Sequence, residues 1–224
     1  WVALVCLATG PIVGAETRHV GPSQLVASPD GSMLYVACAT AERVDTFDVA
    51  SLRPLRSTAL PGSPGGLDVS PDGRTIHVTC SGKRSEWCAV EAATGKLLRR
   101  ATVGNSAMAP VPSPDGNTVW VCCRFLDRLE QIRVADGKVL RSISVGREPI
   151  AAALSVDGRQ LFVAHHLPEG AADSPPVAAG VSVVDSASGT VVRRLSLPNG
   201  ATGLRDIRRS PDGRHACVTH LIAR

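Results

Sequence analysis

The chain has few aromatic residues and little net charge. Aromatic side chains make up 3% of its 224 residues, and its formal net charge is +4. A surface that binds nucleic acid typically carries a basic stripe with interleaved aromatic residues, and the sequence contains no such stripe. We therefore expect no nucleic-acid partner.

Catalytic motifs and long apolar runs are also absent from the sequence. It contains no Gly-x-Ser-x-Gly elbow, no His-Glu-x-x-His, no glycine-rich phosphate loop and no Cys-x-x-Cys-His for covalent haem. No apolar run reaches the roughly 20 residues that a transmembrane helix requires. The sequence thus predicts no catalytic residue, no cofactor site and no transmembrane span in this chain.

What the chain does contain is a repeated turn. Ser-Pro-Asp-Gly occurs four times, and a fifth copy at residues 155–158 differs only in its missing proline. The five copies begin at residues 28, 70, 113, 155 and 210, so successive starts lie 42, 43, 42 and 55 residues apart. A period in the low forties accommodates four short strands with their turns, which is the length of one β-propeller blade.

The segments around each turn have the character of β-strands. Proline presets the φ angle of a type I turn, glycine takes the position with positive φ, and the flanking residues alternate or run apolar. The sequence therefore predicts an all-β fold, a β-propeller of four-stranded antiparallel blades with four repeats plus the start of a fifth. A sandwich of β-hairpins is the alternative, but it predicts no fixed period. The inner strands are expected near residues 23–28, 65–70, 107–112, 150–155 and 204–209.

One repeat position, at the end of the second strand, holds only side chains that can bind metals. Metal ligands must converge within about 2.0–2.3 Å of one point, whereas equivalent positions in different blades lie far apart. His165 and His220 are therefore only weak metal candidates. The same separation argues against a disulfide framework, and a bond between Cys80 and Cys88, across one loop, is the pairing left open. The residues at this repeat position are Cys38, Cys80, Cys123, His165 and His220.

The first fifteen residues differ from the rest of the chain. Residues 1–15 are apolar and uncharged and end in Val13-Gly14-Ala15, small residues arranged as at a signal-peptide cleavage site. We interpret them as the remnant of a signal peptide, which predicts export to the periplasm or the cell surface; a first propeller strand is the alternative. Residues 16–224 then form a partial propeller, which we expect to belong to a longer protein.

The fourth repeat carries an insertion. Its spacing of 55 residues, against 42 for the repeat before it, places about 13 additional residues within the segment 165–180, which is rich in proline and alanine. Such loops on one face of a scaffold commonly carry binding functions. The sequence predicts that this loop contacts a protein partner or a neighbouring domain, through His165, His166, Glu169 and Asp173. A tolerated surface insertion is the alternative.

Several segments carry a family resemblance. Residues 35–38, 44–48 and 181–185, together with the Ser-Pro-Asp-Gly turns, resemble the YVTN-type β-propeller repeat, and the likeness extends over about residues 21–220. Where the family has asparagine, this chain has the cysteines and histidines described above. The resemblance implies a β-propeller of about seven blades.

Three further segments resemble one subgroup of this family. Residues 166–168, 197–205 and 218–224 look like those of a subgroup of large exported bacterial propellers, in which a cytochrome c domain similar to di-haem peroxidases follows the blades. The resemblance implies that haem c is bound beyond residue 224, in a domain that the propeller contacts.

The sequence is consistent with two functions from different classes. The first is a non-catalytic binding or scaffold module of an exported bacterial protein that contains a c-type cytochrome. The second is an enzyme similar to lactonase-type or amine-dehydrogenase-type propellers, with its site in the central channel. The channel would then be lined by Asp68, Met108, Arg205 and Asp206.

Overall fold

The computed structural model describes residues 20–170, 173, 177–210 and 212–222. The predicted signal peptide, residues 1–15, lies outside this part of the chain. The described residues form five consecutive antiparallel sheets, which we call blades 1 to 5, and the first four have four strands each in sequence order. This arrangement confirms the predicted all-β fold of four-stranded blades.

The strands have the following bounds. Blade 1 contains β1 (Pro22–Ala27), β2 (Met33–Cys38), β3 (Arg43–Asp48) and β4 (Pro54–Ala59). Blade 2 contains β5 (Ser63–Val69), β6 (Thr75–Ser81), β7 (Glu86–Glu91) and β8 (Leu97–Thr102). Blade 3 contains β9 (Ala107–Pro112), β10 (Thr118–Cys123), β11 (Arg128–Arg133) and β12 (Val139–Ser144), with the 3₁₀ turn η1 (Arg124–Leu126). Blade 4 contains β13 (Pro149–Leu154), β14 (Gln160–His165), β15 (Gly180–Asp185) and β16 (Thr190–Ser196), and blade 5 contains β17 (Thr202–Arg209) and β18 (Ala216–Ile222).

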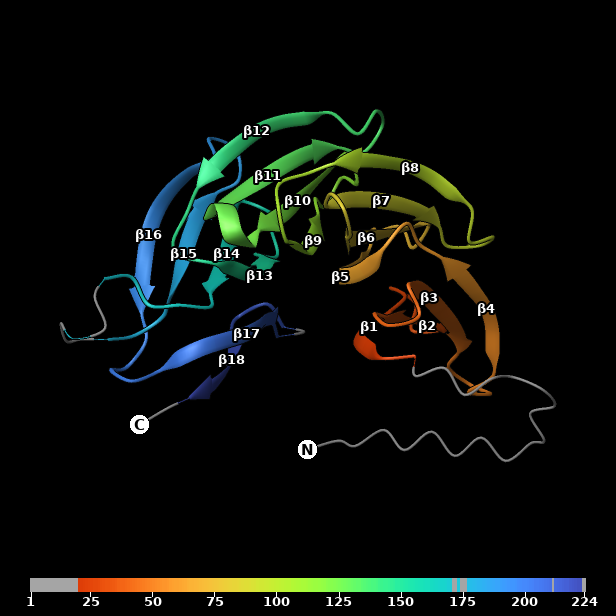
Figure 1. The fold of residues 1–224 in the computed structure, drawn as a ribbon, viewed down its shortest axis with the longest axis horizontal. Helices are drawn as coiled ribbons and strands as arrows, with labels where there is room; N and C mark the ends of the chain where they lie inside the picture. The colour runs from red at the N-terminus through yellow and green to blue at the C-terminus, as the bar shows by residue number, and fades with distance from the viewer. Residues whose placement is uncertain (1–19, 171–172, 174–176, 211, 223–224) are drawn as a thin grey trace.

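The blades follow one another along an arc (Figure 1). The first strands of the blades, β1, β5, β9, β13 and β17, lie on its concave side, and β4, β8, β12 and β16 lie on its convex side. Each first strand packs against the first strand of the next blade. The five inner strands begin and end within two residues of the positions predicted from the sequence.

Local hydrogen bonds explain why the repeated turn forms. In the first copy, Ser28 Oγ donates to Asp30 Oδ1 at 2.5 Å and accepts from the Met33 N–H at 2.9 Å. Gly31 adopts a φ of 71°, a conformation that glycine reaches without steric cost. The hydrogen bonds from Ser28 and Ser32 lower the pKa of Asp30 to about 2. The other four copies share the Ser–Asp hydrogen bond and the positive φ at glycine.

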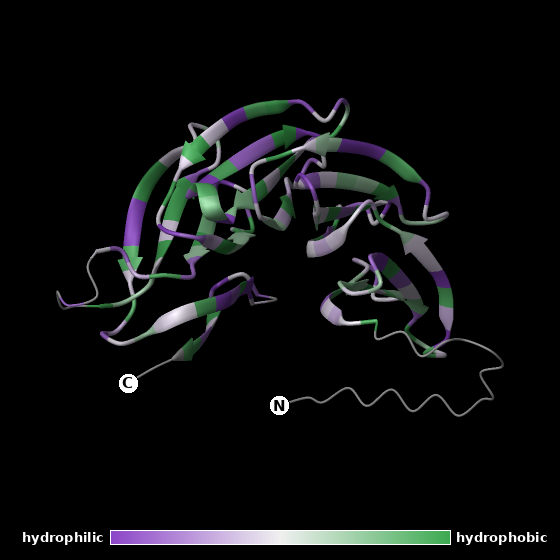
Figure 2. Ribbon diagram, in the orientation of Figure 1, coloured by the Kyte–Doolittle hydropathy of each residue, from purple (hydrophilic) through white to green (hydrophobic). Residues whose placement is uncertain are grey.

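The hydrophobic core lies between blades. Apolar side chains from facing sheets form four clusters, which contain Leu67, Trp87, Trp120 and Leu204 among their buried members. Figure 2 shows hydrophilic stretches along the outer strands β8, β12 and β16, in agreement with the exposure of β8 and β16. Because both faces of a middle strand are covered by neighbouring blades, these strands are apolar on both sides.

The six cysteines in the described part of the chain are free thiols. Cys80 and Cys88 do not form the disulfide that the sequence left open. Five of the six are buried, as expected for small apolar side chains, but Cys217 is exposed. Among the described residues no helix has the length and hydropathy needed to cross a membrane.

Candidate functional site

The four residues proposed for the channel line one cavity. It has a volume of about 330 Å³ and is formed by the inner strands of all five blades. Asp68 comes from β5, Met108 from β9, and Arg205 and Asp206 from β17. The structure therefore brings together residues up to 138 positions apart in the sequence (68 to 206), as the channel hypothesis requires. The cavity is also lined by Ser23, Gln24 and Arg208, which no motif in the sequence singles out.

Each inner strand has a β-bulge or irregularity beside this cavity. In four of the strands one residue has no partner in the neighbouring strand: Ser23, Gly65, Ile150 or Arg205. All four line the cavity. In β9 the irregularity falls near Ala109, whose φ of 39° is unusual for a residue with a Cβ. Bulges reorient side chains in this way next to binding sites, and the sequence offers no local signal for them.

The charged side chains of the cavity have different environments. Arg208 Nε lies 2.9 Å from Asp206 Oδ2, and Asp206 Oδ1 accepts a hydrogen bond from the Ile207 N–H at 2.9 Å. Asp68 is partly buried and accepts a hydrogen bond from the Val69 N–H at 2.8 Å. Burial raises the pKa of Asp68 from 3.8 to about 6, the Val69 N–H and Arg208 lower it in part, and Asp206 raises it slightly.

The cysteines at the repeat position of potential metal ligands interact with side chains of their own blades. Cys38 Sγ lies 3.4 Å from Asp45 Oδ2, and burial together with the Asp45 charge raises the pKa of Cys38 to about 11. A hydrogen bond with Cys88, together with burial, raises the pKa of Cys80. Burial and the charge of Glu130 raise the pKa of Cys123 to about 12.

The two histidines at this repeat position lie in different blades. His165 Nε2 forms a hydrogen bond of 2.8 Å with Ser182 Oγ, and both residues are buried. His220, in β18, is exposed and pairs in register with Leu204. Across the described residues, no three metal-binding side chains are grouped so that they could hold one ion. The structure therefore does not bring the weak metal candidates together.

The inserted loop is anchored at both ends. His166 Nδ1 donates to the Leu204 carbonyl at 3.0 Å, and the Glu169 carboxylate pairs with Arg194. At the other end the Ala179 N–H bonds to the Ala201 carbonyl at 2.8 Å, and Ala179 is fully buried. Asp173 is exposed. Of the predicted contact residues, His165 is therefore a buried anchor, whereas Glu169 and Asp173 are accessible.

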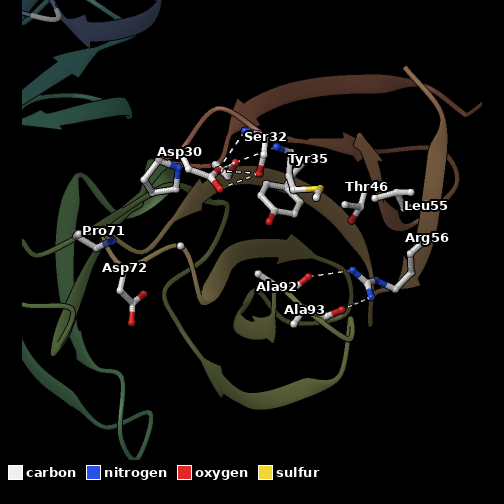
Figure 3. Close-up of a pocket in the computed structure, with 14 residues that line it drawn as sticks. Asp30, Ser32, Tyr35, Thr46, Leu55, Arg56, Pro71, Asp72, Ala92 and Ala93 are labelled. Atoms are coloured by element: carbon white, nitrogen blue, oxygen red, sulfur yellow. Dashed lines mark hydrogen bonds between the residues drawn. The ribbon is translucent and has the colours of Figure 1, made fainter. Parts of the chain in front are cut away.

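A second cavity of about 470 Å³ lies between blades 1 and 2 (Figure 3). Its charged side chains already take part in hydrogen bonds: Arg56 donates to the carbonyls of Ala92 and Ala93 through its terminal nitrogens, although its Nε has no partner, and the carboxylates of Asp30 and Asp72 accept hydrogen bonds in their own turns. Because these groups are engaged in holding the blades and turns, this cavity is a weaker binding site than the central one.

Comparison with known proteins supports the fold. The hydrazine synthase of Kuenenia stuttgartiensis has a TM-score of 0.81 and 26% identity over 94% of this chain and 59% of that one. A protein from Desulfotomaculum acetoxidans DSM 771, described as functionally unknown, has a TM-score of 0.69 and 14% identity, over 87% of this chain and 61% of that one. No protein-family model matches the chain, and no curated protein matches it.

The sheet topology and these structural similarities together define the class of protein. The chain is a β-propeller module. It spans about three fifths of each of the two solved chains to which it is similar.

Proposed function

We propose that this module is part of a larger exported bacterial redox protein and binds a partner or neighbouring domain without catalysing a reaction. The similarity to hydrazine synthase supports the proposal that the module is part of a larger protein, because the matching fold there occupies 59% of a longer chain. The resemblance to YVTN-type propellers followed by a cytochrome c domain supplies the redox role. The sequence of residues 1–15 supports export.

The arrangement of polar side chains favours binding over catalysis. The side chains of Ser182 and His165 form a hydrogen bond with each other, but these residues are only 1% and 3% exposed. A substrate could not reach a nucleophile at that depth. In the central cavity the Ser23 hydroxyl donates to the Ala37 carbonyl at 3.3 Å, and not to a histidine or carboxylate side chain. The inserted loop, with Glu169 and Asp173 accessible, is the proposed contact surface.

The absorption spectrum of the complete purified protein tests the redox proposal. A Soret band that persists after denaturation is expected, because c-type haem is covalently attached. A complete protein without haem would refute the cytochrome proposal. Sequencing of the mature N-terminus tests export, and we expect it to begin at Glu16.

An enzyme with its site in the central channel is the second candidate. It is favoured by one observation, the convergence of Asp68, Met108, Arg205 and Asp206 on the same cavity. If the chain acts on lactones or amines, Arg205→Gln and Asp206→Asn should abolish turnover in the complete protein. Turnover that is unaffected by both substitutions would exclude this site.

A further inference from the structure

Two of the four charged side chains in the central cavity are engaged with each other, and two are not. Arg208 and Asp206 form an ion pair. Among the described residues, the carboxyl of Asp68 receives a hydrogen bond only from the adjacent Val69 N–H, and it forms no ion pair, although the charge of Arg208 lowers its pKa in part. Within the part of the chain that the structure describes, Arg205 forms no hydrogen bond or ion pair and is exposed. The cavity therefore presents one uncommitted guanidinium and one uncommitted carboxyl.

Blade packing does not account for these two charges. The repeat position of Asp68, two residues before the turn, is apolar in blades 1, 3 and 4. A carboxylate there adds no packing and carries a desolvation cost, which appears as its raised pKa. The bulge position of Arg205 holds serine, glycine or isoleucine in blades 1, 2 and 4. The apolar residues equivalent to Asp68 are Val26, Val111 and Ala153.

The surroundings of the two charges restrict the ligand. A guanidinium binds a carboxylate through two parallel hydrogen bonds, and a carboxylate accepts from an ammonium group. Between them the wall is apolar, with Met108, Ile150 and Ala152. Charges interact more strongly beside such a low-dielectric wall than in water. The volume of about 330 Å³ lies at the low end of the range of roughly 300–1,000 Å³ found for small-molecule sites.

We propose that the central cavity binds a small amino-acid zwitterion, with its carboxylate on Arg205 and its ammonium group on Asp68. A short hydrocarbon segment of the ligand lies against the apolar wall. A dianion would bring a second negative charge towards Asp68, and a dication would bring a second positive charge towards Arg205. Charge of both signs on one small molecule is therefore the feature that the site selects.

Isothermal titration calorimetry of the complete protein tests the proposal. The probes are the linear ω-amino acids from glycine to 6-aminohexanoate. Glutarate and 1,5-diaminopentane, which carry charge of one sign only, are the controls. At neutral pH at least one ω-amino acid should bind with a Kd of about 1 mM or tighter, and both controls should bind at least about tenfold more weakly. Binding should weaken as the pH falls below 6, because Asp68 becomes protonated.

Two variants and a matched control locate the site. Arg205→Gln and Asp68→Asn should each reduce the affinity for the best probe by about tenfold or more, the usual effect of losing a charged hydrogen bond. Arg209→Gln, at an exposed arginine on the same strand that does not line the cavity, should leave it unchanged. Circular dichroism checks that each variant is folded.

Three outcomes would overturn the proposal: no ω-amino acid binds, glutarate or 1,5-diaminopentane binds equally well, or the affinity is unaffected by Arg205→Gln. Each can be read whether or not the complete protein contains haem, so this test is separate from that of the redox role.

Discussion

The guanidinium of Arg141 lies over the ring of Trp120, with its central carbon 5.1 Å from the ring centroid. The same guanidinium donates to Gln131 Oε1 at 2.7 Å, and it reaches across to blade 4, where it donates to the carbonyls of Ser186 at 2.6 Å and Ala187 at 2.8 Å. Arg56 makes the equivalent contacts between blades 1 and 2. At these two interfaces an arginine thus connects an outer strand to the hairpin turn of the next blade.

Replacement of Arg141 should loosen blade 4 from blade 3. Arg141→Met keeps the apolar stem but loses the two charge-assisted hydrogen bonds to blade 4 and the one to Gln131, so we expect the free energy of unfolding to fall by about 2–4 kcal/mol. Urea denaturation measures this change. Arg159→Met, at a side chain that is 84% exposed, is the control and should have little effect. Equal losses in the two variants would show that the inter-blade bonds contribute nothing.

Removal of the Asp68 charge should stabilise the fold. The pKa of Asp68 is about 6 in the folded chain against an ordinary 3.8, so the native state is penalised as the pH rises through 6. Asp68→Asn should match the wild type below about pH 4 and exceed it by roughly 2–3 kcal/mol at pH 7. Denaturation at both pH values checks this. A variant less stable than the wild type at pH 7 would show that the carboxylate supports the fold, which would contradict its assignment as an uncommitted binding group.

Replacement of His77 should make the protein less sensitive to acid. His77 is fully buried, stacks on Trp87 at 5.7 Å and has no hydrogen-bond partner at either ring nitrogen. Burial lowers its pKa from 6.5 to about 4, so its contribution to stability is lost as the pH falls through that range. His77→Phe should remove this loss, and Phe162 already occupies the same repeat position in blade 4.

The measurement is the difference in unfolding free energy between His77→Phe and the wild type at several pH values. It should grow by about 1.4 kcal/mol for each pH unit below 6.5, down to about pH 4. A difference that does not change with pH would refute the burial-induced shift. His165, whose pKa is also lowered to about 4 by burial, should retain its own acid sensitivity in the variant.

Shortening of the inserted loop should separate partner contact from stability. The far end of the loop is part of the fold, because Ala179 is fully buried and the Val177 N–H donates to Asn199 Oδ1 at 2.7 Å. Deletion of residues 170–176 spares both anchors and should leave the thermal melt of the complete protein nearly unchanged. Its contact with the partner or neighbouring domain, measured by limited proteolysis of the junction, should weaken. If the propeller unfolds on this deletion, the loop is required for the fold and its assignment as a contact surface is wrong.

The sequence alone determined the blades and their order. The turn depends on neighbours in the chain: a serine hydroxyl, an aspartate two residues later and a glycine with positive φ. Strand alternation is equally local, and each inner strand lies directly before its turn, so the inner strands could be placed within two residues. These features do not depend on what the rest of the chain does.

Tertiary structure decided which polar groups meet. Cys38 and His165 each form a hydrogen bond with a diagonal neighbour across a strand pair, Asp45 for Cys38 and Ser182 for His165, and these pairs depend on register. Asp68 and Arg205 share a cavity because the arc brings β5 and β17 to the same centre and a bulge exposes Arg205 there. Such convergence arises from blade packing over more than a hundred residues, and no local pattern in the chain encodes it.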